Sequence, residues 1–222
     1  MPQPNEEQFG PEEFAEQASV SRETLARLKL YASMLVDWNA RQNLVSQASL
    51  KTMWLRHFWD SAQLTAYIPP AAVSFVDLGS GAGFPGLVLA ELLRTRAIRM
   101  VLYESTQKKR DFLAAVASRL RLDVEIRPGR IEAANPEIFE VITARACAPL
   151  PKLLDYAQSF WGAGTVALFL KGQNLGPELT LAHNYWTMAI TKHPSRSSSS
   201  GTVLEIRELR RVAANRKGAR GS

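Results

Sequence analysis

The chain has 222 residues, of which 46% are hydrophobic and 22% are charged, which is ordinary usage for a globular protein. This composition excludes a collagen-like, coiled-coil or wholly disordered chain, and the length suits one domain with an added segment. The single cysteine, Cys147, excludes an intrachain disulfide and fits a reducing compartment. The polar N-terminus predicts no signal peptide, and no apolar stretch approaches the ~20 residues of a membrane helix. We therefore expect a cytoplasmic protein that does not bind membranes.

The net charge of +6 is unevenly distributed along the chain. Residues 1–191 hold 19 basic and 19 acidic side chains, whereas residues 192–222 hold eight basic and two acidic ones. A second basic cluster spans residues 94–130, with ten basic against four acidic side chains. Clustered Lys and Arg suit a polyanion, because neutralised phosphates release counterions. The alternative is a solvated tail with ordinary helix surfaces, and charge alone does not decide between the two.

Two helices are predicted near the N-terminus. Ser21 is the expected N-cap of the first, in which apolar residues recur at helical spacing as far as Val36. Ser49 is the expected N-cap of the second, which the pair Pro69 and Pro70 ends. We interpret residues 1–70 as an N-terminal helical extension.

From residue 71 onward, short runs rich in Val, Ile and Phe alternate with helical patterns. Strands are expected at 73–78, 98–104, 123–127, 139–144, 164–170 and 202–208, and helices at 85–94, 106–120, 150–160 and 177–189. This alternation predicts βαβ units and an α/β fold with a doubly wound, mostly parallel sheet over residues 71–211. We interpret the serine-rich stretch 195–201 as a mobile loop and residues 212–222 as a basic tail.

A glycine-rich loop follows the first expected strand and opens a helix. Asp77 ends that strand, and Gly79, Gly81, Gly83 and Gly86 follow it. Glycines there allow a tight turn and let a ligand approach main-chain N–H groups. The spacing Gly81-x-Gly83-x-x-Gly86 matches the dinucleotide fingerprint, whereas the spacing from Asp77 to Gly83 matches the loop of S-adenosylmethionine (AdoMet) methyltransferases. We favour the second, because an acidic residue at the strand end suits a cationic amino-acid group and because the motif begins directly at that end.

Glu104 ends the second strand, where a carboxylate can accept hydrogen bonds from both ribose hydroxyls of a nucleoside. NAD would use the same carboxylate, so Glu104 predicts a nucleoside cofactor without selecting AdoMet. The alternative is a surface acid neutralised by Lys108 or Lys109. After the third strand, backbone groups can read the adenine edge, with Ile131 covering the ring. Glu132 lies beside them and is equally well explained as a helix N-terminal acid.

Arg145 and Cys147 follow the fourth strand, whose carboxyl end should face the reaction site. An arginine among small apolar residues is costly unless it meets an anion, such as a cofactor carboxylate or an RNA phosphate. The alternative for Arg145 is an ion pair with Asp77, Asp60 or Glu132 that braces the sheet. Cys147 has the side chain for covalent attack on a pyrimidine, but we favour a small buried thiol.

Together these motifs resemble the RsmG (GidB) family of bacterial small-subunit rRNA guanine-N7 methyltransferases. The likeness covers about residues 30–172 in consistent order. It is carried by WNARQNLVS (38–46), RHFWDS (56–61), DLGSGAGFPG (77–86), ESTQKKRDFL (104–113), ITARACAPL (142–150) and LKG (170–172). This combination is far more specific than the glycine loop alone.

The resemblance implies a Rossmann-like class I AdoMet-dependent fold with a seven-stranded sheet. It also implies methylation of N7 of a guanine in 16S rRNA, guanine 527 in the family, with 16S rRNA or the small ribosomal subunit as the partner. We expect a monomer and no metal site. The implied cofactor contacts are Gly79, Phe84, Ile131, Glu132 and Arg145, to which the strand-end motifs add Asp77, Gly81 and Glu104.

The segment RHFWDS should place Arg56, His57 and Asp60 near the mouth of the cofactor site, with Phe58 and Trp59 in the core. Guanine N7 already carries a lone pair, so methylation there requires no strong general base. Alignment of the reactants and exclusion of water can suffice. No catalytic group is therefore assigned, and the candidates are Arg145, His57 and Asp60.

Two other functions are open on the sequence. One is a small-molecule methyltransferase on the same scaffold, against which the basic clusters argue. The other is an RNA-binding protein without catalysis, against which the intact glycine loop argues.

Overall fold

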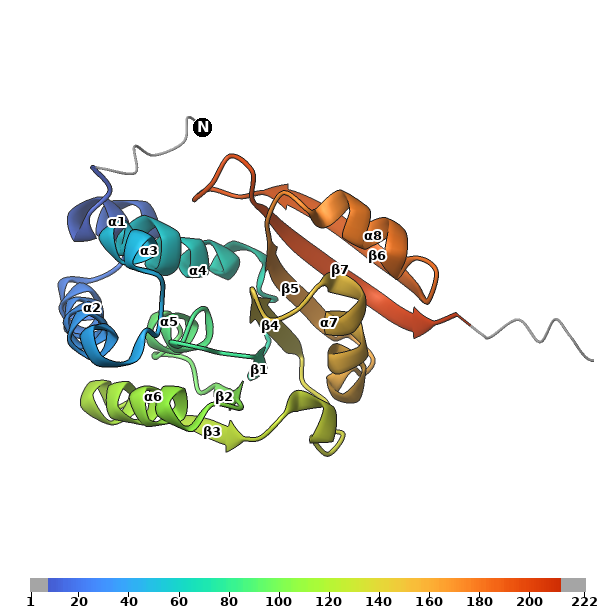
Figure 1. Cartoon of the computed structure of the whole chain (residues 1–222), viewed down its shortest axis with the longest axis horizontal. Helices are drawn as coiled ribbons and strands as arrows, with labels where there is room; N and C mark the ends of the chain where they lie inside the picture. The colour runs from blue at the N-terminus through green and yellow to red at the C-terminus, as the bar shows by residue number, and fades with distance from the viewer. Residues whose placement is uncertain (1–7, 213–222) are drawn as a thin grey trace, which may run out of the picture.

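The computed structural model describes residues 8–212, and a seven-stranded sheet with helices on both faces forms its centre (Figure 1). The strands are β1 (Ser74–Leu78), β2 (Arg99–Glu104), β3 (Val124–Pro128), β4 (Val141–Arg145), β5 (Val166–Lys171), β6 (Trp186–Pro194) and β7 (Thr202–Arg211). Their order is β3-β2-β1-β4-β5-β7-β6; β1 to β5 are parallel, and β7 runs antiparallel to β5 and β6. This confirms the predicted doubly wound, mostly parallel sheet, and all six expected strands overlap observed ones.

Apolar runs in the central strands are buried on both faces of the sheet. Consecutive side chains point to opposite faces of a strand, so Met100 and Leu102 of β2 join one hydrophobic cluster while Val101 and Tyr103 join the other. Helices α2 (Arg22–Gln42), α5 (Gly86–Leu92) and α6 (Gln107–Leu120) cover the first face. Helices α7 (Leu150–Ala157), followed by η4 (Gln158–Phe160), and α8 (Leu175–Ala182) cover the second (Figure 1). A short η3 (Ile131–Ala133) links β3 to β4.

The N-terminal helices pack on the first face. Ser21 caps α2 as predicted, with its side chain accepting a hydrogen bond from the Thr24 N–H at 3.2 Å. A further helix, α1 (Pro11–Ala18), is not expected from the sequence pattern, and its Phe14 is fully buried against Trp54 and Phe58. These helices share one hydrophobic cluster with α5, α6 and the sheet, and the boundary at residue 70 stays a prediction.

The segment between Ser46 and Pro69 is less regular than predicted. Ser46, not Ser49, is the N-cap, because the Ser46 hydroxyl accepts the Ser49 N–H at 3.1 Å. The chain continues as α3 (Gln47–Lys51), the π-helix η1 (Trp54–Trp59), α4 (Asp60–Ala62) and the 3-10 helix η2 (Gln63–Tyr67), which ends before the two prolines as expected. Single π-turns of this kind often occur at functional sites.

The predicted helix over 177–189 is wrong in its second half. Helix α8 ends at Ala182, and Trp186 begins β6. In β6 the more buried side chains, Trp186, Met188 and Ile190, alternate with exposed ones. This period of two is typical of a half-buried strand, and β6 is the seventh strand at the edge of the sheet.

The prediction of a mobile serine loop is also wrong. Ser195 and Ser197 are buried, with exposed fractions of 4% and 3%, and their hydroxyls form hydrogen bonds with Gln63 and Asp60. The packing of this loop is polar, so a search for apolar residues does not detect it. Residues 213–222, which hold most of the predicted tail, lie outside the described residues. Among residues 8–212, no helix is long and apolar enough to span a membrane.

Half of the basic side chains in the cluster at 94–130 form hydrogen bonds or ion pairs with other groups of the chain. Five of its arginines donate to Glu91, Glu125, Glu137, Gln107 or main-chain carbonyls, and these are Arg94, Arg96, Arg99, Arg110 and Arg127. For these five side chains the structure corrects the prediction of a polyanion surface. Over residues 8–212, Lys108 and Lys109 at the start of α6 have no such side-chain partner.

Candidate active site

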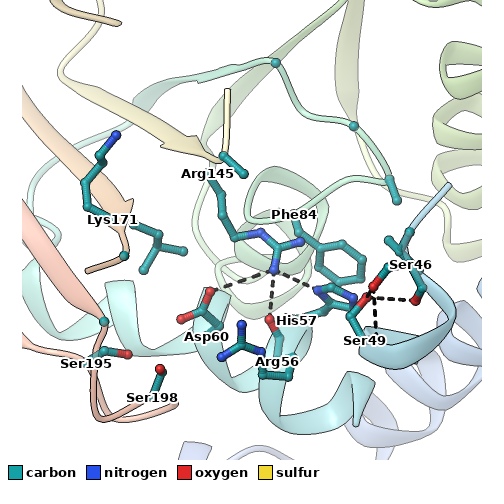
Figure 2. A pocket seen from close by; sticks show the side chains of 18 of the residues that line it. Ser46, Ser49, Arg56, His57, Asp60, Phe84, Arg145, Lys171, Ser195 and Ser198 are labelled. Atoms are coloured by element: carbon teal, nitrogen blue, oxygen red, sulfur yellow. Dashed lines mark hydrogen bonds and ion pairs between the residues drawn. The ribbon is translucent and has the colours of Figure 1, made fainter. Parts of the chain in front are cut away.

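A cavity of about 590 Å³ opens where β1, β4 and β5 end. Ligands bind at this edge of open α/β sheets, and the volume suits a small organic ligand. The glycine loop forms one wall, and η1 with the loop 195–201 forms another (Figure 2). Of the predicted site residues, the cavity is lined by Gly79, Gly81, Phe84, Arg145, His57 and Asp60, and not by Asp77, Glu104, Ile131 or Glu132.

The glycine loop joins β1 to α5 in a conformation that other residues rarely adopt. Gly79, Gly81 and Gly83 have φ angles of 70°, 59° and 92°. A Cβ on Gly81 would meet only the Gly79 carbonyl, at 3.9 Å, so open space lies beside this residue. A Cβ on Gly86 would lie 2.8 Å from a carboxylate oxygen of Asp77, so Gly86 serves close packing instead. The loop is therefore a cradle of backbone with room for a ligand at Gly81.

Asp77 forms hydrogen bonds at the base of this loop, from within the protein core. It is fully buried, and its carboxylate accepts the Thr143 hydroxyl at 2.8 Å and the Gly86 N–H at 3.3 Å. Burial raises the pKa of Asp77 to about 6, and the hydrogen bonds that it accepts oppose this rise. The carboxylate faces these two groups and does not line the cavity, and its contact with a cationic ligand group stays a prediction.

The predicted nucleoside side lies next to the cavity. The Glu104 carboxylate accepts the N–H groups of Gly81 at 2.9 Å and Thr106 at 2.8 Å, so it adjoins the glycine loop. Neither Lys108 nor Lys109 pairs with it among the described contacts. After β3, Ile131 is buried, whereas Glu132 is exposed.

Glu132 belongs to a small surface cluster. Its carboxylate accepts the Tyr156 hydroxyl at 2.7 Å, and the Lys152 ammonium lies 3.8 Å away. Hydrogen bonds from its own backbone N–H and from Tyr156 lower the pKa of Glu132. Glu132 is the second residue of η3. This position suits both interpretations of Glu132, an acid at the start of a helical turn and a contact of the ligand.

Arg145 ends β4 and crosses the cavity floor. Its Nη1 donates to the Arg56 carbonyl at 2.8 Å, lies 2.7 Å from His57 Nδ1 and lies 3.8 Å from Asp60 Oδ2 (Figure 2). The guanidinium carbon lies 5.1 Å from the centre of the Phe84 ring. Burial lowers the pKa of Arg145 and raises that of Asp60. Asp60 is thus one of the acids expected to pair with Arg145 if that pair braces the sheet. The distance of 3.8 Å between them leaves Arg145 able to bind a further anion.

His57 is held as a neutral hydrogen-bond acceptor. Because Arg145 can only donate, His57 Nδ1 must accept, and the ring proton is assigned to Nε2. Nε2 is buried and has no partner among the described residues. Burial, followed by the charges of Arg145 and Arg56, lowers the pKa of His57 to about 3. His57 therefore carries no charge near neutral pH, and its ring stacks on Phe84 at 4.9 Å.

Asp60 connects Arg145 to the loop 195–201. While its Oδ2 faces Arg145, its Oδ1 accepts the Ser197 hydroxyl at 2.5 Å and the Gln63 amide at 2.9 Å. Gln63 in turn accepts the Arg196 N–H at 2.8 Å. The loop is thereby fixed to the helical segment on which Arg56, His57 and Asp60 lie.

Cys147 does not have the properties of a nucleophile. Burial raises the pKa of its thiol to about 11, so the reactive thiolate is scarce at neutral pH. Its sulfur packs against Gly79, where an added Cβ would lie 2.7 Å away. The prediction of a small thiol is thus supported, but Cys147 is half-buried and not fully buried as expected.

Several cavity residues escape prediction from the sequence. One is Glu178 of α8, which pairs at 2.6 Å with Lys171, the expected cation at the end of β5, and no local signal points to this acid. Hydroxyls from two distant segments also line the cavity, and these are Ser46, Ser49, Ser195, Ser198 and Ser200. Two clusters of serine separated in sequence are a weak signal until the fold brings them together.

Comparison with known proteins gives a consistent result. The family profile described as GidB, rRNA small subunit methyltransferase G, matches residues 24–206. The chain is 45% identical over 201 residues to the ribosomal RNA small subunit methyltransferase G of Parvibaculum lavamentivorans, covering 89% of both chains. It is 43% identical over 202 residues to the protein of the same name from Rhodospirillum rubrum, covering 91% of this chain and 99% of that one.

Among solved structures, the ribosomal protein L11 methylase of Lactobacillus delbrueckii subsp. bulgaricus is similar, with a TM-score of 0.55 at 15% identity. The match covers 71% of this chain and 78% of that one. At this level of identity the likeness shows the shared fold alone.

Proposed function

We propose that this chain, which belongs to the GidB family of rRNA small subunit methyltransferases G, transfers a methyl group from AdoMet to N7 of a guanine in 16S rRNA. The observation that carries the proposal is the cavity in which the backbone cradle at Gly81 and the buried Arg145 meet at the carboxyl edge of the sheet. As a further step we assign guanine 527 as the target, and we infer that a monomer acts in the cytoplasm.

The residues present fit AdoMet as the cofactor. Open space beside Gly81, at a positive φ, suits close approach of a ligand to the backbone. The Glu104 carboxylate adjoins the same loop and suits ribose hydroxyls, while Ile131 and Glu132 would cover the adenine. When bound, AdoMet supplies an electrophilic methyl group on its sulfonium sulfur.

The chain's own side chains suit alignment rather than proton transfer. The lone pair of guanine N7 needs no base. The lowered pKa of His57, about 3, makes it a weak base, and the raised pKa of Cys147, about 11, leaves little thiolate to act as a nucleophile. Arg145 supplies a planar donor at the cavity floor, held by the Arg56 carbonyl and His57. The buried ring of Phe84 and the loop 195–201 adjoin this floor and would help to exclude water once the ligands are bound.

Calorimetric titration with AdoMet, with NAD as the comparison, tests the cofactor. Tritium transfer from labelled AdoMet to naked 16S rRNA and to small subunits that lack the modification then tests the substrate. Mapping 7-methylguanine in the product identifies the nucleotide. AdoMet binding without transfer to either RNA substrate would contradict the proposed reaction.

A further inference from the structure

Four basic side chains line the cavity, and two of them already bond to other groups of the chain. Lys171 pairs with Glu178, and Arg145 is held by the Arg56 carbonyl, His57 and Asp60. Over residues 8–212, the Arg56 guanidinium and the Lys109 ammonium form no hydrogen bond or ion pair with another group. The cavity therefore has two positive charges in excess of its two acids, Asp60 and Glu178.

Arg56 is exposed although its neighbours on both sides in η1 are buried. It occupies the third position of the π-helix η1, between the buried Leu55 and the buried His57. Figure 2 shows its side chain pointing into the cavity, between the wall that carries Ser49 and the wall that carries Ser195 and Ser198. An unpaired guanidinium between two walls of hydroxyls has the donors that a phosphate oxygen requires.

The wall at 195–201 is rigid enough to serve as part of a site. The buried hydroxyl of Ser197 is bonded to Asp60, and the Ser195 N–H donates to the Gly201 carbonyl at 3.0 Å. Ser198 and Ser200 consequently face the cavity, whereas Ser199 between them does not line it. A fixed hydroxyl loses less conformational entropy on binding than a mobile one.

We propose that the Arg56 guanidinium, with the hydroxyls of Ser198 and Ser200, forms a subsite for a backbone phosphate of the RNA strand next to the methylated guanine. This inference rests on the proposed function, because it requires RNA as the substrate. The subsite is formed by η1 and the loop 195–201, and among the described residues none of its three members contacts Gly81 or Glu104, so we assign it to the acceptor and not to the cofactor. Its role is to fix the strand while the target base enters the cavity.

The test compares Arg56→Gln and Arg56→Lys with the unchanged chain in RNA binding over a range of salt concentrations, methylation kinetics and AdoMet titration. Losing one phosphate contact should lower the salt slope of RNA binding by roughly 0.7–0.9. We expect Arg56→Gln to raise the KM for RNA about tenfold and to leave AdoMet affinity within about twofold. Arg56→Lys should recover the slope and part of the KM, since it keeps the charge but not the fork.

Matched controls exist in the same chain. Ser198→Ala and Ser200→Ala should each raise the KM for RNA, whereas Ser199→Ala, one residue away and outside the cavity lining, should not. Arg22→Gln, at the exposed start of α2, controls for the loss of one positive charge elsewhere.

An unchanged KM and salt slope in Arg56→Gln would overturn the subsite. A fall in AdoMet affinity would overturn it too, because Arg56 would then bind the cofactor. Failure of the unchanged chain to methylate RNA counts against the proposed function alone, since the salt slope of RNA binding still tests Arg56.

Discussion

Two walls of the cavity are built by different physical means. The glycine wall, residues 79–83, is backbone, and three positive φ angles within five residues set its shape. The opposite wall, formed by η1 and the loop 195–201, is set by side chains, such as the bond from Ser197 to Asp60 between residues 137 positions apart. One wall depends on local conformation and the other on tertiary contacts.

This difference predicts how each wall fails. A side chain placed at Gly81 both strains the backbone and enters the open space beside the loop, so its effect on ligand binding should be nearly complete. Several hydrogen bonds together hold the opposite wall in place, among them those of Asp60 and Gln63. Single substitutions there should weaken function by degrees.

The largest effect is expected for Gly81→Val. A β-branched residue is disfavoured at φ 59°, with left-handed backbone costing roughly 1–2 kcal/mol, and its methyl groups would fill the open space beside the loop. We expect AdoMet affinity to fall by about a hundredfold or more, which is about 2.8 kcal/mol, because the methyl groups occupy space that the ligand needs. Calorimetric titration of the folded variant measures it.

Gly164→Val is the matched control. Gly164 also has a positive φ, 83°, and open space where a Cβ would lie, but it comes before β5 and away from this cavity. It should lose stability through the same strain and keep its AdoMet affinity. Equal loss of binding in both variants would mean that strain, and not the ligand space, explains the first result.

The second effect concerns Arg145→Lys, where the two walls meet. Lysine keeps the charge but loses the fork that contacts the Arg56 carbonyl and His57. Loss of a charged, aligned hydrogen bond costs about 1.5–3 kcal/mol, which is about ten- to a hundredfold in rate. Methylation and melting temperature should be measured on one preparation.

Arg211→Lys controls for the general effect of this exchange, because Arg211 also has one acid, Asp155 at 3.1 Å, and one ring, Trp186 at 5.0 Å. It should stay active. If Arg145→Lys is less stable yet fully active, Arg145 merely braces the sheet through Asp60.

The sequence predicts the glycine wall well, because the cause of its geometry is local. Asp77 and the glycines that follow it lie within ten residues, and their spacing alone indicates a strand, a turn and a helix. The contacts that Asp77 makes with Thr143 and Gly86 are nevertheless not predicted. Whether a strand-end carboxylate faces the ligand or the loop depends on Thr143, which comes from another strand.

The opposite wall could not be predicted in the same way. The run 195–201 has no apolar residue, so hydrophobic periodicity indicates a mobile loop there. Its order comes from Asp60 and Gln63, which bond to residues 137 and 133 positions away in the sequence. The edge strand β6 escapes prediction for a related reason, since its short alternating pattern follows α8 almost without a break.

Ser197→Ala should have a smaller effect than either change above. It removes one of two donors to Asp60 Oδ1 and leaves the bond from Gln63 in place. We expect a loss of about 1–3 kcal/mol in the free energy of unfolding. The KM for RNA should rise several-fold, because the wall loosens, while AdoMet affinity stays constant.

Urea unfolding and methylation kinetics check this, with Ser199→Ala as the control in the same loop. A fall in AdoMet affinity in Ser197→Ala would show that the two walls are coupled, and the contrast between a local wall and a tertiary wall would then fail.

The smallest effect concerns the charge of His57, and it appears only below neutral pH. The pKa of His57 in the folded chain is about 3, against 6.5 for an ordinary histidine. Between these values the unfolded chain binds more protons at this site, so the free energy of unfolding falls as pH falls below 6.5. At pH 5.5 this loss amounts to about 1.4 kcal/mol relative to pH 7.5.

His57→Gln keeps an acceptor for Arg145 and removes the titrating group. The variant should therefore lose less stability than the unchanged chain when the pH falls from 7.5 to 5.5, and the difference between the two chains isolates His57. The difference is needed because Asp77 acts in the opposite direction. Its pKa is raised to about 6 in the folded chain, so its protonation increases the free energy of unfolding as pH falls. His183→Gln, at the exposed end of α8, controls for the removal of a histidine elsewhere. Equal pH dependence in the unchanged chain and His57→Gln would mean that the pKa of His57 is the same in the folded and the unfolded chain. The contact with Arg145 would then not hold the His57 ring in its neutral form.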